Sequence, residues 1–229
     1  MTDETPGNGG NPIVARAKAI ILKPKEEWPV IDRETTPSGD IFTRYALPLA
    51  AIGPVAQFIG GQVFGYGAFG VTYRPSIASG LSMAILGFVL SLVGLFVVSF
   101  IADKLAPKFG GESSSRSAFK LVAYSMTASW LAGIFGLIPS LSLLGIVGLY
   151  SFYLFYVGAG TLMKVPEDKT LTYTIVTVVC VLLIYIVIGG VTAGLGGLGG
   201  APSLSGGTIS SLQGLESIDQ GLRAAIVRG

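Results

Sequence analysis

The sequence predicts an all-α membrane protein, a polytopic helical bundle with five transmembrane helices and short interfacial amphipathic helices. Of the 229 residues, 51% are hydrophobic and only 12% are charged, whereas soluble domains carry about 25% charged residues. The mean hydropathy is +0.69. The stretch 121–163 contains no Asp, Glu, Lys or Arg. At about 1.5 Å per helical residue it is roughly twice as long as the hydrocarbon core is thick, so it must fold back on itself.

The N-terminal region is predicted to stay outside the membrane. Residues 1–11 are polar and Gly-rich, and we expect a disordered tail there. Residues 12–44 are expected to form a cytoplasmic amphipathic helix and an interfacial segment. Asn11-Pro12 is typical of a helix start, with Asn as the cap and Pro at the first helical position. Five apolar residues then fall on one face: Ile13, Val14, Ala17, Ile20 and Ile21.

Such a helix either anchors in the headgroup region or packs on the protein's own cytoplasmic surface, and the sequence leaves both open. The segment 23–31 follows, with two prolines and mixed charges. It predicts a compact crossing of the headgroup region, a boundary that suits the indole ring of Trp28. The alternative is a packed loop.

Five apolar segments follow, at about 45–64, 80–102, 119–138, 141–163 and 171–191. The first contains Pro48 and Pro54, which predict a kinked or late-starting helix. The second and third carry small residues at intervals of seven and four, namely Gly80, Gly87 and Gly94, then Ala128, Ala132 and Gly136. Such stripes favour close helix–helix packing, with a substrate path as the alternative.

The third and fourth segments are predicted to turn at Ile138-Pro139-Ser140, because proline disfavours helix in the residue before it. The fourth carries Tyr150, Tyr153 and Tyr156 on one side. These tyrosines are interpreted as packing residues or interface anchors, with a hydroxyl-lined cavity as the alternative. The fifth segment is rich in Val, Ile and Thr.

Basic residues predict the orientation. With the N-terminus in the cytoplasm, twelve Lys and Arg lie on the cytoplasmic side and three lie outside, as the positive-inside rule requires. We therefore expect a multi-pass protein of a bacterial inner (cytoplasmic) membrane with its C-terminus outside. Residues 192–229 form a Gly-rich tail. Its apolar residues, spaced three or four apart from Ile209 to Ile226, predict a short amphipathic helix or a frayed tail.

No catalytic, cofactor-binding or metal-binding residues are predicted, and the protein is not expected to be an enzyme. Histidine is absent and Cys180 is the single cysteine, so the commonest general base and metal ligand are missing. The glycines of 65–70 match GxGxxG in letters, yet they follow a membrane helix rather than a strand. Because basic and acidic residues are intermixed, nucleic-acid binding is not expected either.

The five segments contain no Asp, Glu or internal Arg, which argues against proton- or ion-coupled transport. Lys120, at the start of the third segment, is expected to extend to the membrane surface. A neutral pore stays open as an alternative. Gln57 and several hydroxyls could solvate a polar solute or bond to neighbouring helices: Ser125, Thr127, Ser129 and Ser151.

The order of these pieces resembles the YIP domain family of integral membrane proteins, in its bacterial form. The resemblance covers about 14–191 and rests on an N-terminal helix, the 23–31 segment, five spans and single residues along them. These residues are Pro24, Trp28, Tyr124, Pro139, Tyr150, Tyr153, Gly158 and Pro166. Eukaryotic relatives are associated with vesicle trafficking, binding of small Rab-type GTPases and membrane shaping. The short N-terminal region here has no evident GTPase-binding motif, so GTPase binding is not carried over.

Together these features predict a non-catalytic membrane protein with a trafficking-like, scaffold or membrane-organising role, acting through helix packing and oligomerisation. Its expected partners are the lipid bilayer and either further copies of itself or other membrane proteins. The alternative is a small permease or channel component that moves a neutral solute.

Overall fold

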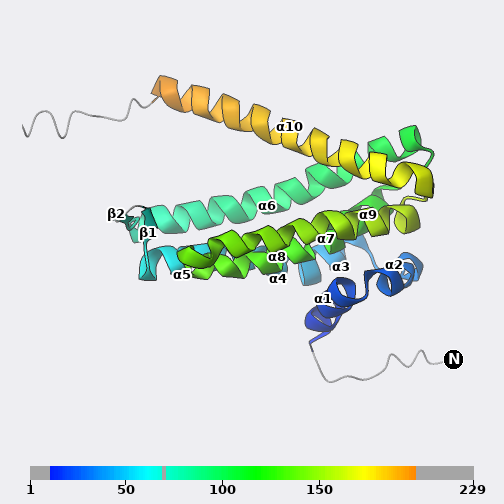
Figure 1. Ribbon diagram of the computed structural model, residues 1–229, viewed down its shortest axis with the longest axis horizontal. Helices are drawn as coiled ribbons and strands as arrows, with labels where there is room; N and C mark the ends of the chain where they lie inside the picture. The colour runs from blue at the N-terminus through cyan, green and yellow to red at the C-terminus, as the bar shows by residue number, and fades with distance from the viewer. Residues whose placement is uncertain (1–10, 69–70, 200–229) are drawn as a thin grey trace, which may run out of the picture. The chain divides into compact units, whose positions relative to one another are not determined.

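The structure is a computed structural model that describes residues 11–68 and 71–199 (Figure 1). The chain divides into two compact units, Met1–Val181 and Leu182–Gly229. The first unit contains the helical bundle. In the second, the structure describes the continuation of helix α10 (Glu167–Gly199). The predicted N-terminal tail, apart from Asn11, and the predicted amphipathic helix of the C-terminal tail lie outside the described residues.

Two short helices open the described chain, α1 (Pro12–Leu22) and α2 (Pro24–Arg33). The side chain of Asn11 accepts a hydrogen bond from Ile13 N at 3.0 Å, so α1 begins with an Asn cap. Ile20 is fully buried, whereas Val14 on the same predicted face is 62% exposed. The apolar face of α1 therefore packs partly on the protein's own surface.

The first span, Ser38–Val63, is broken into pieces. They are α3 (Ser38–Ile41), the π-helical η1 (Phe42–Ala46), α4 (Leu47–Ala50) and α5 (Ile52–Val63). Pro48 has no N–H to donate to the carbonyl oxygen one helical turn earlier. This missing hydrogen bond accounts for the wider π turn just before it. The span begins before residue 45, earlier than the sequence predicts.

A small antiparallel hairpin, β1 (Tyr66–Ala68) and β2 (Val71–Tyr73), connects α5 to the next span, with Tyr66 opposite Tyr73. The sequence did not predict these strands. Helix α6 (Ile77–Leu105) follows and continues into η2 (Ala106–Phe109). Gly110 ends it with a left-handed φ of 82°, a conformation that glycine adopts without strain.

The third span contains α7 (Ser115–Ser125), α8 (Thr127–Ala132) and the 3₁₀ helix η3 (Gly133–Leu137). The fourth contains the 3₁₀ helix η4 (Pro139–Leu149) and α9 (Tyr150–Leu162). The two spans separate at Ile138, which has an extended backbone (φ −118°, ψ 106°) inside the predicted turn. An eleven-residue 3₁₀ helix is long for this conformation.

Four segments of the described chain are long and apolar enough to cross a membrane: Ser38–Val63, Ile77–Phe109, Ser115–Leu137 and Ser140–Leu162. The fold is thus the all-α membrane bundle that the sequence predicts, with one span fewer among the described residues. The fifth predicted span, 171–191, lies within α10. Helix α6 runs alongside α5 and α7, and α8, which continues the span of α7, contacts α5 (Figure 1).

The buried core lies where α1 and α2 meet α7 and α9. Trp28, Ile20, Leu121 and Leu154 are fully buried there. In contrast, α6 exposes a long series of apolar side chains. The core therefore fixes the N-terminal helices to the bundle, and α6 stays largely uncovered by the chain itself.

Candidate functional site

Trp28 fixes α2 against the membrane bundle. A Cβ atom at position 158 would lie 2.6 Å from Trp28 Cε2 and 2.7 Å from Leu121 Cδ1, so only glycine allows α9 this close. The indole nitrogen of Trp28 is buried and has no hydrogen-bond partner within the described chain. Apolar packing therefore holds the ring. The sequence left open a headgroup boundary or a packed loop for Trp28, and the structure shows the side chain fully buried on helix α2.

A cluster of ion pairs lies beside the contact between α2 and the membrane bundle. Arg16 on α1 binds the carboxylates of Glu27 and Glu34, and its guanidinium lies 5.8 Å from the centre of the Tyr124 ring. Burial alone would lower the pKa of Arg16, but the carboxylates of Glu34 and Glu27 outweigh it, and the pKa is raised. Arg16 therefore stays charged and links α1, α2 and α7.

Lys120 does not extend to the membrane surface. Its side chain is buried, and its ammonium donates hydrogen bonds to the backbone oxygens of Ile31, at 3.0 Å, and Glu34. These carbonyls lie at the C-terminal end of α2, where helix carbonyls lack intrahelical donors. The positive charge also suits the negative end of the helix dipole. Lys120 therefore caps α2 instead of contacting headgroups.

Two tyrosines complete the contact. The hydroxyl of Tyr150 donates to Ile21 O at 3.0 Å, which joins α9 to the end of α1. The ring of Tyr124 lies 4.8 Å from that of Tyr45, whose hydroxyl is 2.8 Å from Thr127 Oγ1. We call this assembly the N-terminal dock and define it by Arg16, Trp28, Lys120, Tyr124, Tyr150 and Gly158.

The dock thus brings together four of the residues on which the family resemblance rests, Trp28, Tyr124, Tyr150 and Gly158. Pro24 opens α2 beside them and is buried. The others lie elsewhere. Tyr153 is 41% exposed, with its ring 5.3 Å from that of Tyr150, Pro139 opens η4, and Pro166 accepts a hydrogen bond from Thr170 Oγ1 at 2.9 Å.

The small residues of the second and third spans lie mostly in helix contacts. A Cβ at Gly80 would meet Gln62 Nε2 at 2.8 Å, and one at Gly136 would meet Gln57 Cγ at 2.7 Å. A Cβ at Gly87 would lie 4.0 Å from Pro54 Cγ, and Gly94 is buried within α6. Two more, Ala128 and Ala132, are buried in α8.

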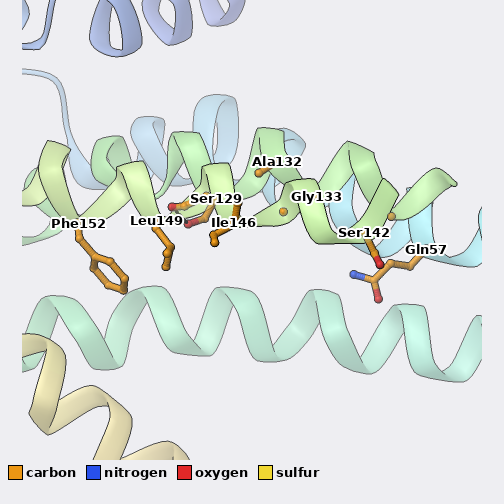
Figure 2. A pocket seen from close by; sticks show the side chains of 11 residues that line it. Gln57, Ser129, Ala132, Gly133, Ser142, Ile146, Leu149 and Phe152 are labelled. Carbon is orange, nitrogen blue, oxygen red and sulfur yellow. Dashed lines mark hydrogen bonds between the residues drawn. The ribbon is translucent and has the colours of Figure 1, made fainter. Parts of the chain in front are cut away.

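A pocket of about 650 Å³ lies among the first, third and fourth spans. Figure 2 shows it running from Phe152 and Leu149 at one end to Gln57 and Ser142 at the other. In a 3₁₀ helix, residues three apart share a face. The wall follows this period, with Gly133 and Gly136 on η3 and Ser142, Gly145 and Gly148 on η4.

A second pocket of about 550 Å³ shares Gln57, Ser129 and Gly133 with the first. Helices α5 and η3, which line both pockets, approach closely, since a Cβ at Gly133 would lie 2.6 Å from Gly53 Cα. The hydroxyl of Ser129 donates to Gly148 O at 2.9 Å. These pockets are largely apolar, and two of their hydroxyls, on Ser129 and Ser91, bond to neighbouring helices.

The sequence did not reveal the roles of Arg16, Glu27 and Glu34. A pairing between residues of different helices leaves no local pattern in the sequence. Within the described residues, no group of three or more His, Cys, Asp and Glu is placed to hold a metal ion. Lys120 and Tyr150 of the dock donate to backbone oxygens, and Arg16 pairs with two carboxylates. These contacts stabilise helix packing.

Several apolar spans and a docked N-terminal pair of helices define a multi-pass integral membrane protein. The model of the Yip1 domain matches residues 18–189. The chain therefore belongs to the Yip1 domain family, which confirms the resemblance noted in the sequence, and this family is generally one of non-enzymatic membrane proteins. Neither curated proteins nor solved structures gave a match.

Proposed function

We propose that this protein is a non-catalytic membrane scaffold that organises the membrane through helix packing and oligomerisation. The low burial of α6 supports this most. Only 22% of the most apolar window of Ile77–Phe109 is buried inside the chain, against 67% for Ser115–Leu137. A span with so much open surface is available to another helix as well as to lipid.

One stripe of α6 suits a partner helix. Leu86, Leu90, Val93 and Val97 recur at intervals of four, three and four residues, so they lie on one face. Each is at least 36% exposed. The glycine Gly80 on another part of α6 already packs against α5. The stripe is therefore the face that a second copy of the chain would contact.

In this proposal the N-terminal dock faces the cytoplasm of a bacterial inner membrane and the C-terminus lies outside. The distribution of basic residues supports this orientation, since the N-terminal region holds six of the fifteen Lys and Arg. The dock then anchors the cytoplasmic end of the bundle rigidly, while the spans form lateral contacts in the bilayer.

Cysteine crosslinking tests the stripe. In a Cys180→Ser background, Val93→Cys should give a disulfide-linked dimer when native membranes are oxidised. The matched control is Ile59→Cys on α5, which is also exposed, at 43%, but lies off the stripe. Crosslinking at Val93 and not at Ile59 supports the scaffold. Equal crosslinking at both positions, or none at Val93, contradicts the proposed interface.

A second candidate function is a permease or channel component for a neutral solute, and the 650 Å³ pocket favours it. A Cβ at Gly145 meets no atom within 4 Å, so Gly145→Leu adds an apolar side chain at an open position of the pocket wall. In liposomes, a solute flux that Gly145→Leu abolishes would support the permease. Gly39→Leu, at another open glycine, is the control.

A further inference from the structure

A third cavity, of about 580 Å³, lies between the start of the first span, the end of α6 and the start of α7. With 29 residues at about 1.5 Å each, α6 is roughly 44 Å long, which exceeds the ~30 Å hydrocarbon core. Its ends therefore reach the headgroup region. The cavity is thus placed at the boundary between hydrocarbon and headgroups.

The three helices line this cavity with the same pattern, a polar residue towards the span end and a phenylalanine about one turn deeper. On the first span Ser38 precedes Phe42, and on α7 Ser115 precedes Phe119. Helix α6 runs towards this end, so its order is reversed, with Phe96 and Phe100 before Asp103. The cavity therefore has a polar rim and an aromatic floor.

The floor is a connected aromatic surface. The ring centre of Phe96 lies 5.3 Å from that of Phe42 and 5.5 Å from that of Phe119. Phe96 and Phe100 are 51% and 64% exposed, so the floor continues onto the lipid-facing side of α6. An acyl chain from the bilayer can lie on this surface without crossing a polar barrier.

The rim holds one unpaired cation and one buried anion. Within the described chain, the exposed guanidinium of Arg116 has no hydrogen bond or ion pair. Asp103 is 3% exposed. It accepts from Ser113 at 2.8 Å and Ser115 at 3.3 Å, and Lys104 Nζ lies at 3.4 Å. Each carboxylate oxygen has two lone-pair sites, so acceptor capacity is left.

We propose that this cavity binds a zwitterionic phospholipid with a primary-amine headgroup, such as phosphatidylethanolamine. Arg116 binds the phosphate, because guanidinium and phosphate form strong charge-assisted hydrogen bonds. The Asp103 carboxylate attracts the ammonium group, and an acyl chain lies on the phenylalanine floor. An anionic headgroup without an amine would meet the same carboxylate unfavourably, so the rim discriminates between the two lipid classes.

Native mass spectrometry of the purified full chain in detergent tests this, with added dioleoyl phosphatidylethanolamine or dioleoyl phosphatidylglycerol. We expect selective retention of the ethanolamine lipid, and Arg116→Gln should reduce it roughly tenfold, the effect of losing a charge-assisted hydrogen bond. The matched control is Arg44→Gln, at an exposed arginine that belongs to the first span and does not line the cavity. It should leave retention unchanged.

Two further variants separate headgroup from chain recognition. Phe100→Ala, at an exposed position, should weaken both lipids alike, while Asp103→Asn should abolish the preference for ethanolamine over glycerol. Soluble glycerophosphoethanolamine should not displace the lipid at equal concentration, because it lacks the chain. Three results would overturn the proposal. The first is an equal loss of lipid retention in Arg116→Gln and Arg44→Gln, the second is equal retention of both lipids by the unmodified protein, and the third is displacement of the lipid by the soluble headgroup.

Discussion

Gly158 on α9 lies so close to Trp28 that a Cβ at position 158 would stand 2.6 Å from the indole Cε2. Leu121 Cδ1 on α7 lies 2.7 Å from the same point. An N-terminal helix and two membrane spans therefore meet at one glycine. This contact makes the docking of α2 depend on the absence of a side chain far along the sequence.

Gly158→Ala should therefore destabilise the protein. The added methyl group overlaps the indole ring and Leu121, and overpacking of this kind typically costs about 1–3 kcal/mol. Thermal unfolding of the detergent-solubilised protein measures the change. Gly145→Ala is the matched control, because nothing lies within 4 Å of its Cβ. Equal stability of the two variants would show that the contact is not tight.

Arg16→Gln should loosen α1 from the bundle. It leaves Glu27 and Glu34 without their cation, and their side chains are only 17% and 26% exposed. With solvent screening, we expect a loss of about 1–2 kcal/mol. Lys23→Gln is the control, because its pair with Glu26 is solvent-exposed and worth only a few tenths of a kcal/mol.

A double-mutant cycle isolates the Arg16 pair. If the two side chains interact as the structure shows, Arg16→Gln with Glu34→Gln should cost less than the sum of the single variants. The pKa of Arg16 is raised in the folded protein. The stabilisation that its positive charge supplies is therefore complete below the ordinary arginine pKa and is lost as pH rises through the raised pKa. Additive costs would contradict the pairing.

Lys120→Met should expose the end of α2 to faster exchange. The substitution leaves the carbonyl oxygens of Ile31 and Glu34 without their donor, and an unsatisfied buried acceptor costs about 1–3 kcal/mol. Hydrogen–deuterium exchange of the α2 amides measures this. Lys120→Arg keeps a donor and should exchange more slowly than the Met variant. Unchanged exchange in Lys120→Met would place Lys120 at the surface after all.

Ser129→Ala should weaken the contact between α8 and η4. The lost hydroxyl donates to Gly148 O and lies 2.9 Å from Ser151 Oγ, so we expect a loss of about 1 kcal/mol. Ser142→Ala, in the wall of the same pocket but without such a bond within the described chain, should be neutral. Unfolding midpoints of the two variants provide the comparison, and equal midpoints would contradict it.

Local signals predicted much of the fold. Asn11-Pro12 marks the start of α1 because a cap and a proline act on their own few residues. Pro139 similarly ends a helix at Ile138, and the uncharged run on both sides indicates membrane spans. These features depend on residues that are neighbours in the sequence, so the sequence alone is sufficient to predict them.

The dock could not be predicted in this way. Whether Lys120 reaches the surface depends on carbonyl groups of α2, and whether Trp28 is buried depends on Gly158. These are tertiary contacts between distant segments. The long 3₁₀ helix η4 is equally hidden, because its three-residue spacing of Ser142, Gly145 and Gly148 is also compatible with an ordinary small-residue stripe.

The mass of the assembly in native lipid tests the scaffold most directly. Extraction of the protein from its membrane into polymer-bounded lipid discs, followed by mass measurement, should give a multiple of the 23.7 kDa chain. Leu90→Glu with Val93→Glu on the α6 stripe should reduce that mass to one chain. A single chain in the unmodified protein, across the concentrations found in the membrane, would contradict assembly through α6.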